Sequence, residues 1–236
     1  MEETWELAAV NSRFHLFFVI LLTLISVVFI HACSTSGSPR IISENQVEKM
    51  AEAAWKNTLQ KYPKSNDSKV LSRVDNVSEI LVSESDFKDE TWEIVVFEHP
   101  TFRSFSLPTN KIGINSRLIN YVDNDDQVAF VIGSLIASSK SDEAIDRINR
   151  QFLSQALIGG PTIFNSRKTT EQRKANQSLD QVLKYDTESL RLMDKAGFSI
   201  LEARTFLQKL RSESNSGLQN QIEARIENFE KYKAVK

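Results

Sequence analysis

Imidazole and thiol groups, which often bind metals or act in nucleophilic and acid–base catalysis, number four in this 236-residue chain: His15, His31, His99 and Cys33. Two histidines four positions apart on one helix would point toward a single zinc ion. No two histidines of the chain stand at that spacing. A single cysteine excludes both an internal disulfide and a metal site built from several thiolates.

Cys33 follows an apolar segment that predicts export. Residues 16–30 are apolar at all but two positions, and the run ends in Ile-His-Ala-Cys at 30–33. This ending resembles a bacterial lipobox, in which Ala32 supplies the small residue before the cleavage point and the thiol of Cys33 is the site of lipid attachment. The alternative is an uncleaved signal anchor, because the run is at the short end for spanning a bilayer.

The chain is thereby predicted to have three parts. Residues 1–32 are a lipoprotein signal peptide or a signal anchor, 33–42 a polar tether, and 43–236 a folded domain. With 41% apolar and 25% charged residues, the chain can build one sizeable core. A net charge of −2 gives no basic surplus, so a nucleic acid partner is not expected. The expected location is the periplasmic face of the bacterial cell envelope, in the outer membrane of a Gram-negative host, or the inner membrane for a signal anchor.

Within residues 43–236, His99 is the sole histidine, and this excludes a two-histidine metal site in that part. His99 precedes Pro100 in a predicted turn, where a structural or solvated role is favoured over catalysis. Asp123, Asp125 and Asp126 cluster at a predicted helix start. Carboxylate-only chemistry is the alternative there to the favoured interpretation, in which the three acids serve the helix cap and dipole.

Apolar periodicity predicts a mainly helical α+β domain with one small β-sheet. The expected helices span 43–62, 68–82, 128–137, 144–157, 170–196 and 199–210, with a last one that carries Leu218 to Phe229. Strands are expected at 92–97 and 111–114, with a short alternating stretch around Phe105 and Leu107 between them. The helix at 128–137 is apolar on nearly every side, which predicts that it is buried all round.

Capping residues mark the ends of several of these elements. Ser43, Asn124 and Ser199 are predicted N-caps, and Gly197 is predicted to end the preceding helix in the left-handed conformation. Pro108 cannot donate a backbone hydrogen bond, which places it at a strand end or a sheet edge.

The order of these pieces resembles the gluzincin zinc metallopeptidases that include the HtpX-like proteases, the CAAX prenyl proteases and periplasmic lipoprotein peptidases. The stretches FSLP at 105–108 and KIGIN at 111–115 resemble that family's strand pair, and NDDQVAFVIG at 124–133 resembles the lead into its zinc-binding helix. LMDKAGF at 192–198 and ARIENFEK at 224–231 resemble its later helices. The resemblance covers nearly all of residues 43–236 and implies a zincin-like fold.

The chemistry of that family requires His-Glu-x-x-His on one helix, with the two histidines as zinc ligands and the glutamate as general base. The corresponding positions here run from Ser134 to Ser138 and read SLIAS. Serines therefore stand at both ligand positions, and Leu135 stands in place of the base. We expect the two serines to hydrogen-bond to backbone carbonyls rather than to hold a polar ligand.

The family's third zinc ligand comes from a Glu-x-Glu-Ala-Asp stretch, which here reads VLKYD at 182–186. Val182 and Lys184 replace its glutamates, and only Asp186 remains in register. In the family this aspartate holds a histidine in place; here it is expected to cap or pair locally. The sequence thus predicts no catalytic residue, no metal ligand and no cofactor, although zinc is what the resemblance implies for the family.

These observations predict a catalytically degenerate, metallopeptidase-like lipoprotein, a pseudoenzyme with a binding, adaptor or chaperone-like role in the cell envelope. Its partners would be the membrane, through the lipid, and an envelope protein or peptide. The edge expected to hold a peptide by main-chain pairing includes Phe105, Leu107, Pro108 and Ile112. One alternative is an active zinc metalloendopeptidase with a non-standard site. Another is a structural lipoprotein that keeps no groove.

Overall fold

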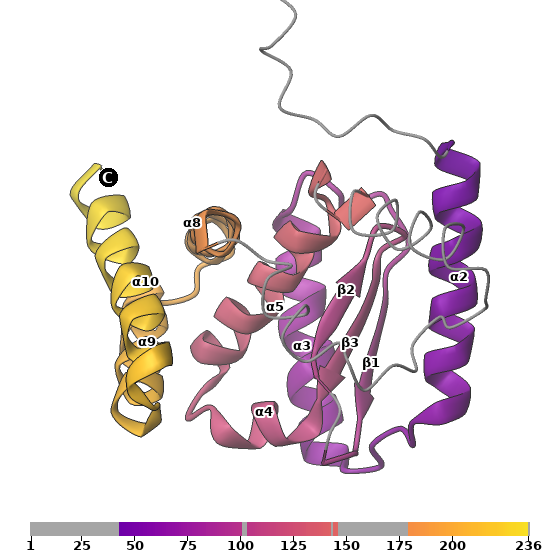
Figure 1. Cartoon of the computed structure of the whole chain (residues 1–236), viewed down its shortest axis with the longest axis horizontal. Helices are drawn as coiled ribbons and strands as arrows, with labels where there is room; N and C mark the ends of the chain where they lie inside the picture. The colour runs from indigo at the N-terminus through magenta and orange to yellow at the C-terminus, as the bar shows by residue number, and fades with distance from the viewer. Residues whose placement is uncertain (1–42, 101–102, 143, 146–178, 236) are drawn as a thin grey trace, which may run out of the picture. The chain divides into compact units, whose positions relative to one another are not determined.

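The computed structural model describes residues 43–100, 103–142, 144–145 and 179–235. Within these ranges the chain forms seven helices and one three-stranded sheet (Figure 1). The helices are α2 (Glu44–Lys61), α3 (Ser68–Glu84), α4 (Ser116–Tyr121), α5 (Asp125–Ser139), α8 (Leu179–Lys195), α9 (Ile200–Glu213) and α10 (Ser216–Val235). The strands are β1 (Glu93–Phe97), β2 (Phe105–Leu107) and β3 (Lys111–Asn115). The predicted α+β class, mainly helical with one small sheet, is confirmed.

The strand order is β1-β3-β2, so β3 is the central strand. It pairs in parallel with β1 and antiparallel with β2. Ile112 shows this central place, because it lies opposite Ile94 on one side and Ser106 on the other.

The outer side of β1 is partly closed by the segment that joins α2 to α3. The N–H of Ser65 donates to the carbonyl of Val96 at 2.8 Å, and the N–H of Glu98 donates to the carbonyl of Pro63 at 2.9 Å. The carboxyl-terminal half of β1 is therefore already paired on both sides. Among the described residues, β2 is the other edge of the sheet.

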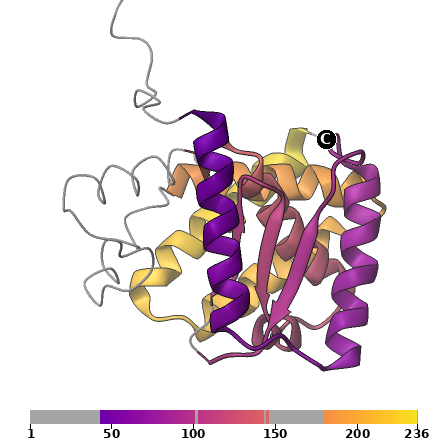
Figure 2. The ribbon, with the colours of Figure 1, turned by 90° about the vertical axis from the view of Figure 1, so that its right-hand side faces the viewer.

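Helices cover both faces of the sheet. On one face α2 packs its Trp55 edge-on against Phe97, with ring centroids 6.0 Å apart, and Leu107 joins this smaller apolar cluster. Figure 2 shows α2 lying in front of the strands. On the other face Val96 and Ile112 belong to the main core, which α3 and α5 help to build.

The helix α5 is the centre of the main core. None of its residues from Val128 to Ser139 is exposed, as the apolar pattern predicts. Asn124 caps its start by accepting a hydrogen bond from the N–H of Gln127 at 3.0 Å. The helices α8, α9 and α10 complete this core with buried side chains that include Leu190, Phe206 and Phe229.

Most predicted helix ends are confirmed. Ser43 forms a full capping box with Gln46, and Gly197 has a φ of 79° in the turn after α8. Ser199 does stand at the start of α9, but its side chain makes no capping hydrogen bond. The N–H of Ser199 donates to Asp126. The carboxylate of Glu202 accepts hydrogen bonds from the side chains of Asn124 and Gln127.

The six-residue helix α4 was not predicted. The predicted helix at 144–157 lies outside the described residues apart from 144–145, as do the first nine residues of the one at 170–196. The predicted export segment and tether, residues 1–42, also lie outside them. None of the helices in the described ranges is long and apolar enough to cross a membrane.

Candidate functional site

The helices α5 and α8 meet at a close approach that fixes where the candidate site residues lie. Ser189 of α8 is fully buried and donates a hydrogen bond to the carbonyl of Phe130 in α5 at 2.8 Å. A Cβ atom placed on Gly133 would lie only 2.5 Å from the hydroxyl oxygen of Ser189. A glycine is therefore needed for this contact, and the next residue of α5 is Ser134.

The residues at this junction offer hydroxyl and alkyl groups. Ser134 and Leu135 are half-buried on α5, and Ser138 is buried one turn further. On α8, Val182 is half-buried and Lys184 is exposed. The lone pairs of neutral hydroxyls are poor ligands for zinc, which takes thiolate, imidazole and carboxylate groups in proteins. In the ranges that the structure describes, no three histidine, cysteine or acidic side chains come together as a metal site. The residues present do not fit a zinc ion.

Asp186 is the buried acid of this junction, with 1% of its surface exposed. The guanidinium of Arg225 donates to both of its carboxylate oxygens, through Nε at 2.6 Å and through a terminal nitrogen at 2.9 Å. Arg225 belongs to α10, so the expectation of a local partner for Asp186 is wrong. The guanidinium also lies 5.7 Å from the ring centroid of Phe130 in α5, which links three helices.

Serine hydroxyls near Ser138 form hydrogen bonds that hold neighbouring elements together. The hydroxyl of Ser141 donates to the carbonyl of Ser138 at 2.8 Å and lies 3.1 Å from the hydroxyl of the buried Tyr185. The next residue, Ser139, donates from its hydroxyl to the carbonyl of Leu107 at the end of β2. These bonds use serines to join the end of α5 to α8 and to the sheet.

The hydrogen-bonding direction of β2 follows from Pro108. Leu107 lies opposite Lys111 in an antiparallel pair. Two opposite residues either exchange hydrogen bonds with each other or are flanked by the bonds of their neighbours. The second pattern would here need an N–H on the residue after Leu107, and Pro108 has none. Leu107 and Lys111 are therefore the directly bonded pair. Residues of a strand alternate in direction, so the main-chain N–H and C=O of Ser106 point away from β3.

Ser106 was not singled out in the sequence, and it is the residue of β2 whose main chain points away from β3, to the side where no strand of the described residues pairs. Phe105 and Leu107 direct their main chains at β3, and Ile112 lies in the central strand with neighbours on both sides. The side chains of these three residues can contact a peptide at this edge, but their main-chain groups cannot form hydrogen bonds with it. The side-chain oxygen of Ser106 is buried and has no hydrogen-bond partner.

Glu90 ties the end of α5 to the turn between β2 and β3. Its carboxylate pairs with Lys140, the residue after α5, and accepts a hydrogen bond from the side chain of Asn110 at 2.6 Å. These hydrogen bonds, the one from Lys140 first, lower the pKa of Glu90. The ammonium of Lys140 also lies over the rings of Phe87 and Trp92, at 4.5 and 5.4 Å from their centroids. The turn that carries Pro108 is thus held against α5.

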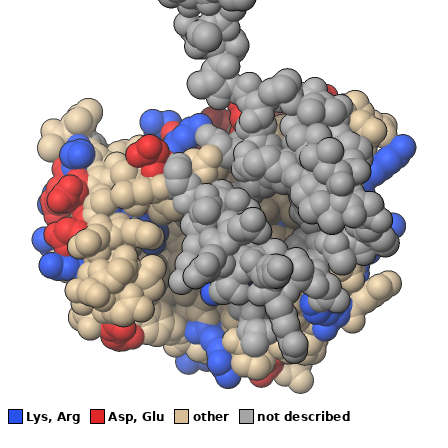
Figure 3. All heavy atoms as spheres, in the orientation of Figure 1, with Lys and Arg blue, Asp and Glu red and all other residues tan. Residues whose placement is uncertain are grey.

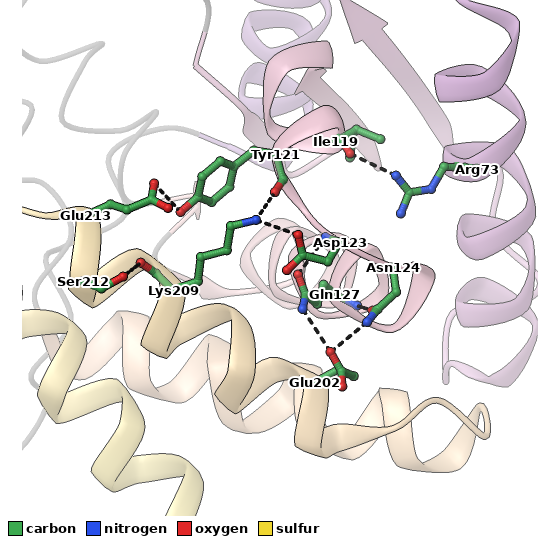
Figure 4. A network of polar contacts seen from close by, with 10 residues as sticks. All are labelled: Arg73, Ile119, Tyr121, Asp123, Asn124, Gln127, Glu202, Lys209, Ser212 and Glu213. Atoms are coloured by element: carbon green, nitrogen blue, oxygen red, sulfur yellow. Dashed lines mark hydrogen bonds and ion pairs between the residues drawn. The ribbon is translucent and has the colours of Figure 1, made fainter.

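A second polar network holds the start of α5 to α9 (Figure 4). Lys209 donates to the carbonyl of Tyr121 at 2.8 Å and to the carboxylate of Asp123 at 2.6 Å. The hydrogen bond from Lys209 lowers the pKa of Asp123. Burial, followed by the hydrogen bond to Glu213, raises the pKa of Tyr121 to about 12. Figure 4 shows Gln127 and Asn124 pointing at the single carboxylate of Glu202 below them.

The acidic cluster at the start of α5 is divided among structural partners. Asp125 pairs with Arg73 at 2.8 Å, and Asp126 accepts a hydrogen bond from the N–H of Ser199 at 2.7 Å. With Asp123 bound to Lys209, each of the three acids has its own partner. The capping hydrogen bond of α5 comes from Asn124, so these contacts join the helix start to neighbouring elements, and the expected role of the acids at the helix dipole stays a prediction for Asp125 and Asp126 in the first turn.

His99 follows the end of β1 and lies close to the end of α2. Its ring packs against Tyr62 with centroids 5.2 Å apart, and its carbonyl accepts a hydrogen bond from the side chain of Asn115 at 3.3 Å. These contacts are structural. Cys33 lies outside the described residues.

One comparison with known proteins gives a match. The family model described as Peptidase family M48 matches residues 68–211, which is more than half of the chain. The matched range begins with α3 and ends within α9, so it includes the whole sheet and the junction of α5 with α8. No curated protein matches the chain.

Proposed function

The chain belongs to peptidase family M48, and from this premise we propose that it is a catalytically degenerate member that binds an extended peptide instead of cleaving one. The sequence supports the loss of hydrolysis, since Ser134, Leu135 and Ser138 stand where the family has its two histidines and its base. The pairing of Asp186 with Arg225 supports it further, because the remaining acid already has a partner.

The loss of metal chemistry is tested on the full-length chain purified in detergent. We expect much less than one zinc ion per chain by elemental mass spectrometry, and no cleavage of casein. Zinc at one ion per chain together with cleavage would contradict the proposal and restore the active metalloendopeptidase. The matched control is a chain with Ser134→Ala, which should give the same zinc content as the natural chain.

The proposed site of peptide binding is the outer side of β2, where no strand of the described residues pairs. An extended chain can add to a sheet edge by main-chain hydrogen bonds. Ser106 offers an N–H and a C=O in that direction, and the turn after β2 is fixed by Ser139 and Glu90. The edge is therefore held in position beside α5, the helix that carries Ser134.

The main-chain role of Ser106 gives a sharp test. Ser106→Pro removes the outward N–H and leaves the bonds of Phe105 and Leu107 with β3 in place, because proline is tolerated at an edge residue whose N–H faces away from the sheet. Ser106→Ala keeps the N–H and is the control. A photocrosslinker at Thr109 should capture an envelope protein with Ser106→Ala and lose most of that product with Ser106→Pro.

Equal capture by the two variants, with both folded by circular dichroism, would contradict pairing at this edge. No captured protein from either variant, or from the natural chain with the same photocrosslinker, would favour a structural lipoprotein without a groove. Both results leave the zinc measurement untouched, so the two halves of the proposal are tested separately.

We further propose that the protein is exported and anchored by lipid on Cys33, with residues 33–42 as the tether. Mass spectrometry of the amino terminus distinguishes the two alternatives. A chain that begins at Cys33 and carries a diacylglycerol supports the lipoprotein, while a chain that keeps residues 1–32 supports the signal anchor. Cys33→Ser should abolish the lipid and with it the chain that begins at residue 33.

A further inference from the structure

Asp186 presents an energetic problem that any fold of this chain must solve. Its carboxylate is 1% exposed, and a charged group taken out of water is strongly destabilising unless it is paired and hydrogen-bonded. Arg225 meets both conditions, since it is oriented side-on to the carboxylate with one nitrogen on each oxygen. The pair as a whole is neutral.

The pair lies at the same junction as the degenerate positions. Val182 comes one helical turn before Asp186 on α8, and Ser189, nearly a turn after it, contacts the residue preceding Ser134 on α5. The guanidinium carbon of Arg225 also lies over the ring of Phe130 in α5. One cation from α10 therefore serves α5 and α8 together.

We infer that Arg225 is a built-in cation that neutralises the buried Asp186, so that the junction of α5, α8 and α10 is stable with no metal bound. A divalent ion at this junction would find the one buried acid already neutralised and a positive charge next to it. This inference concerns stability and stands whether or not β2 binds a peptide.

The ion pair of Arg225 with Asp186 differs in burial from the ion pairs at the surface of α9 and α10. Figure 3 shows Lys, Arg, Asp and Glu side chains together at its left-hand side, where α9 and α10 lie. Those pairs are exposed, as in Arg211 with Glu223, while the pair of Arg225 reaches a carboxylate that is 2% exposed at its side chain.

The test is thermal unfolding of the full-length chain in detergent. The natural chain should melt at the same temperature with zinc, with a chelator and without either, because nothing in its folded state is gained by binding metal. Arg225→Leu leaves Asp186 buried and unpaired, and it should lower the melting temperature by roughly 10 °C. Arg211→Leu, which breaks an exposed pair, is the matched control and should lower it by less than about 3 °C.

A double variant makes the test independent of whether Arg225→Leu folds. With Asp186→Leu added to Arg225→Leu no buried charge is left, so the melting temperature should return to within about 5 °C of that of the natural chain. Three results would each overturn the inference: a shift of the natural chain's melting temperature by zinc or chelator, an Arg225→Leu chain as stable as Arg211→Leu, or a double variant no more stable than the single one.

Discussion

At the scale of single residues, Tyr121 has the clearest measurable signature. Its hydroxyl donates to the carboxylate of Glu213 at 2.9 Å, and burial is the main cause of its pKa of about 12, against an ordinary value near 10. The folded protein holds this proton more tightly than the unfolded chain does. Tyr121 therefore contributes stability that is present below pH ~10 and is lost as the pH rises toward 12.

An ultraviolet titration should show this directly. The raised pKa of Tyr121 should appear as a late part of the tyrosinate absorbance change near pH 12, and Tyr121→Phe should remove that part. Glu213→Gln should move that part to lower pH, because it removes the negative charge but keeps a hydrogen-bond acceptor. A titration curve unchanged by Tyr121→Phe would contradict the assignment.

Several residue-level features could be predicted and others could not. The caps at Ser43 and Asn124 are local, since each side chain bonds to a main chain three residues away, and the sequence shows them directly. The partner of Asp186 was missed because Arg225 lies 39 positions downstream on another helix. No local pattern reports such a contact.

At the scale of elements, the close approach of α5 to α8 predicts an effect of a single methyl group. Gly133→Ala places its Cβ against Ser189, whose hydroxyl would be 2.5 Å away and whose Cα and Cβ would be 3.3 Å away. Because the main-chain atom cannot rotate aside, the helices must shift apart. We expect the free energy of unfolding to fall by about 1–3 kcal/mol, measured by urea denaturation.

A companion variant separates crowding from helix propensity. Alanine favours a helix over glycine by roughly 1 kcal/mol, so a site without crowding would become more stable. In a chain that already carries Ser189→Gly, the blocking side chain is gone. Adding Gly133→Ala to that chain should therefore lower the free energy of unfolding by less than Gly133→Ala does in the natural chain. A stabilised Gly133→Ala chain would show that α5 and α8 are less tightly packed than described here.

The strands were harder to predict than the helices. Their residue ranges could be read from β-branched and aromatic content, but the parallel pairing of β1 with β3 and the central place of β3 depend on contacts between segments. The role of Ser106 follows from Pro108 only once the order of the strands is known. The residues predicted from the sequence for the peptide-binding edge, Phe105 and Leu107 among them, are therefore the neighbours of Ser106 and not Ser106 itself.

At the scale of the whole molecule, α10 should be indispensable although it lies beyond the matched family range. It buries Ile222, Ile226 and Phe229 in the main core, each worth about 1.5–3 kcal/mol, and it supplies Arg225. Together with the unpaired Asp186, the loss is comparable to the whole stability of an ordinary domain, about 5–15 kcal/mol.

A chain that ends at Ser214 should therefore fail to fold, with most of its cooperative thermal transition in circular dichroism lost. A chain that ends at Lys233 is the control and should melt like the natural one, since Val235 is 90% exposed. A cooperative transition in the shorter chain, at a similar temperature, would show that α10 is an appendage rather than part of the core.

The partly closed outer side of β1 limits how many copies of this body can join. A fibre grows when each sheet offers two free edges, one to receive a strand and one to extend to the next molecule. Here the segment of Pro63 and Ser65 already occupies the carboxyl-terminal half of one edge. Two bodies that met at β2 would form a closed pair at that edge, so strand pairing between molecules crowded on a membrane surface should favour dimers over growing filaments.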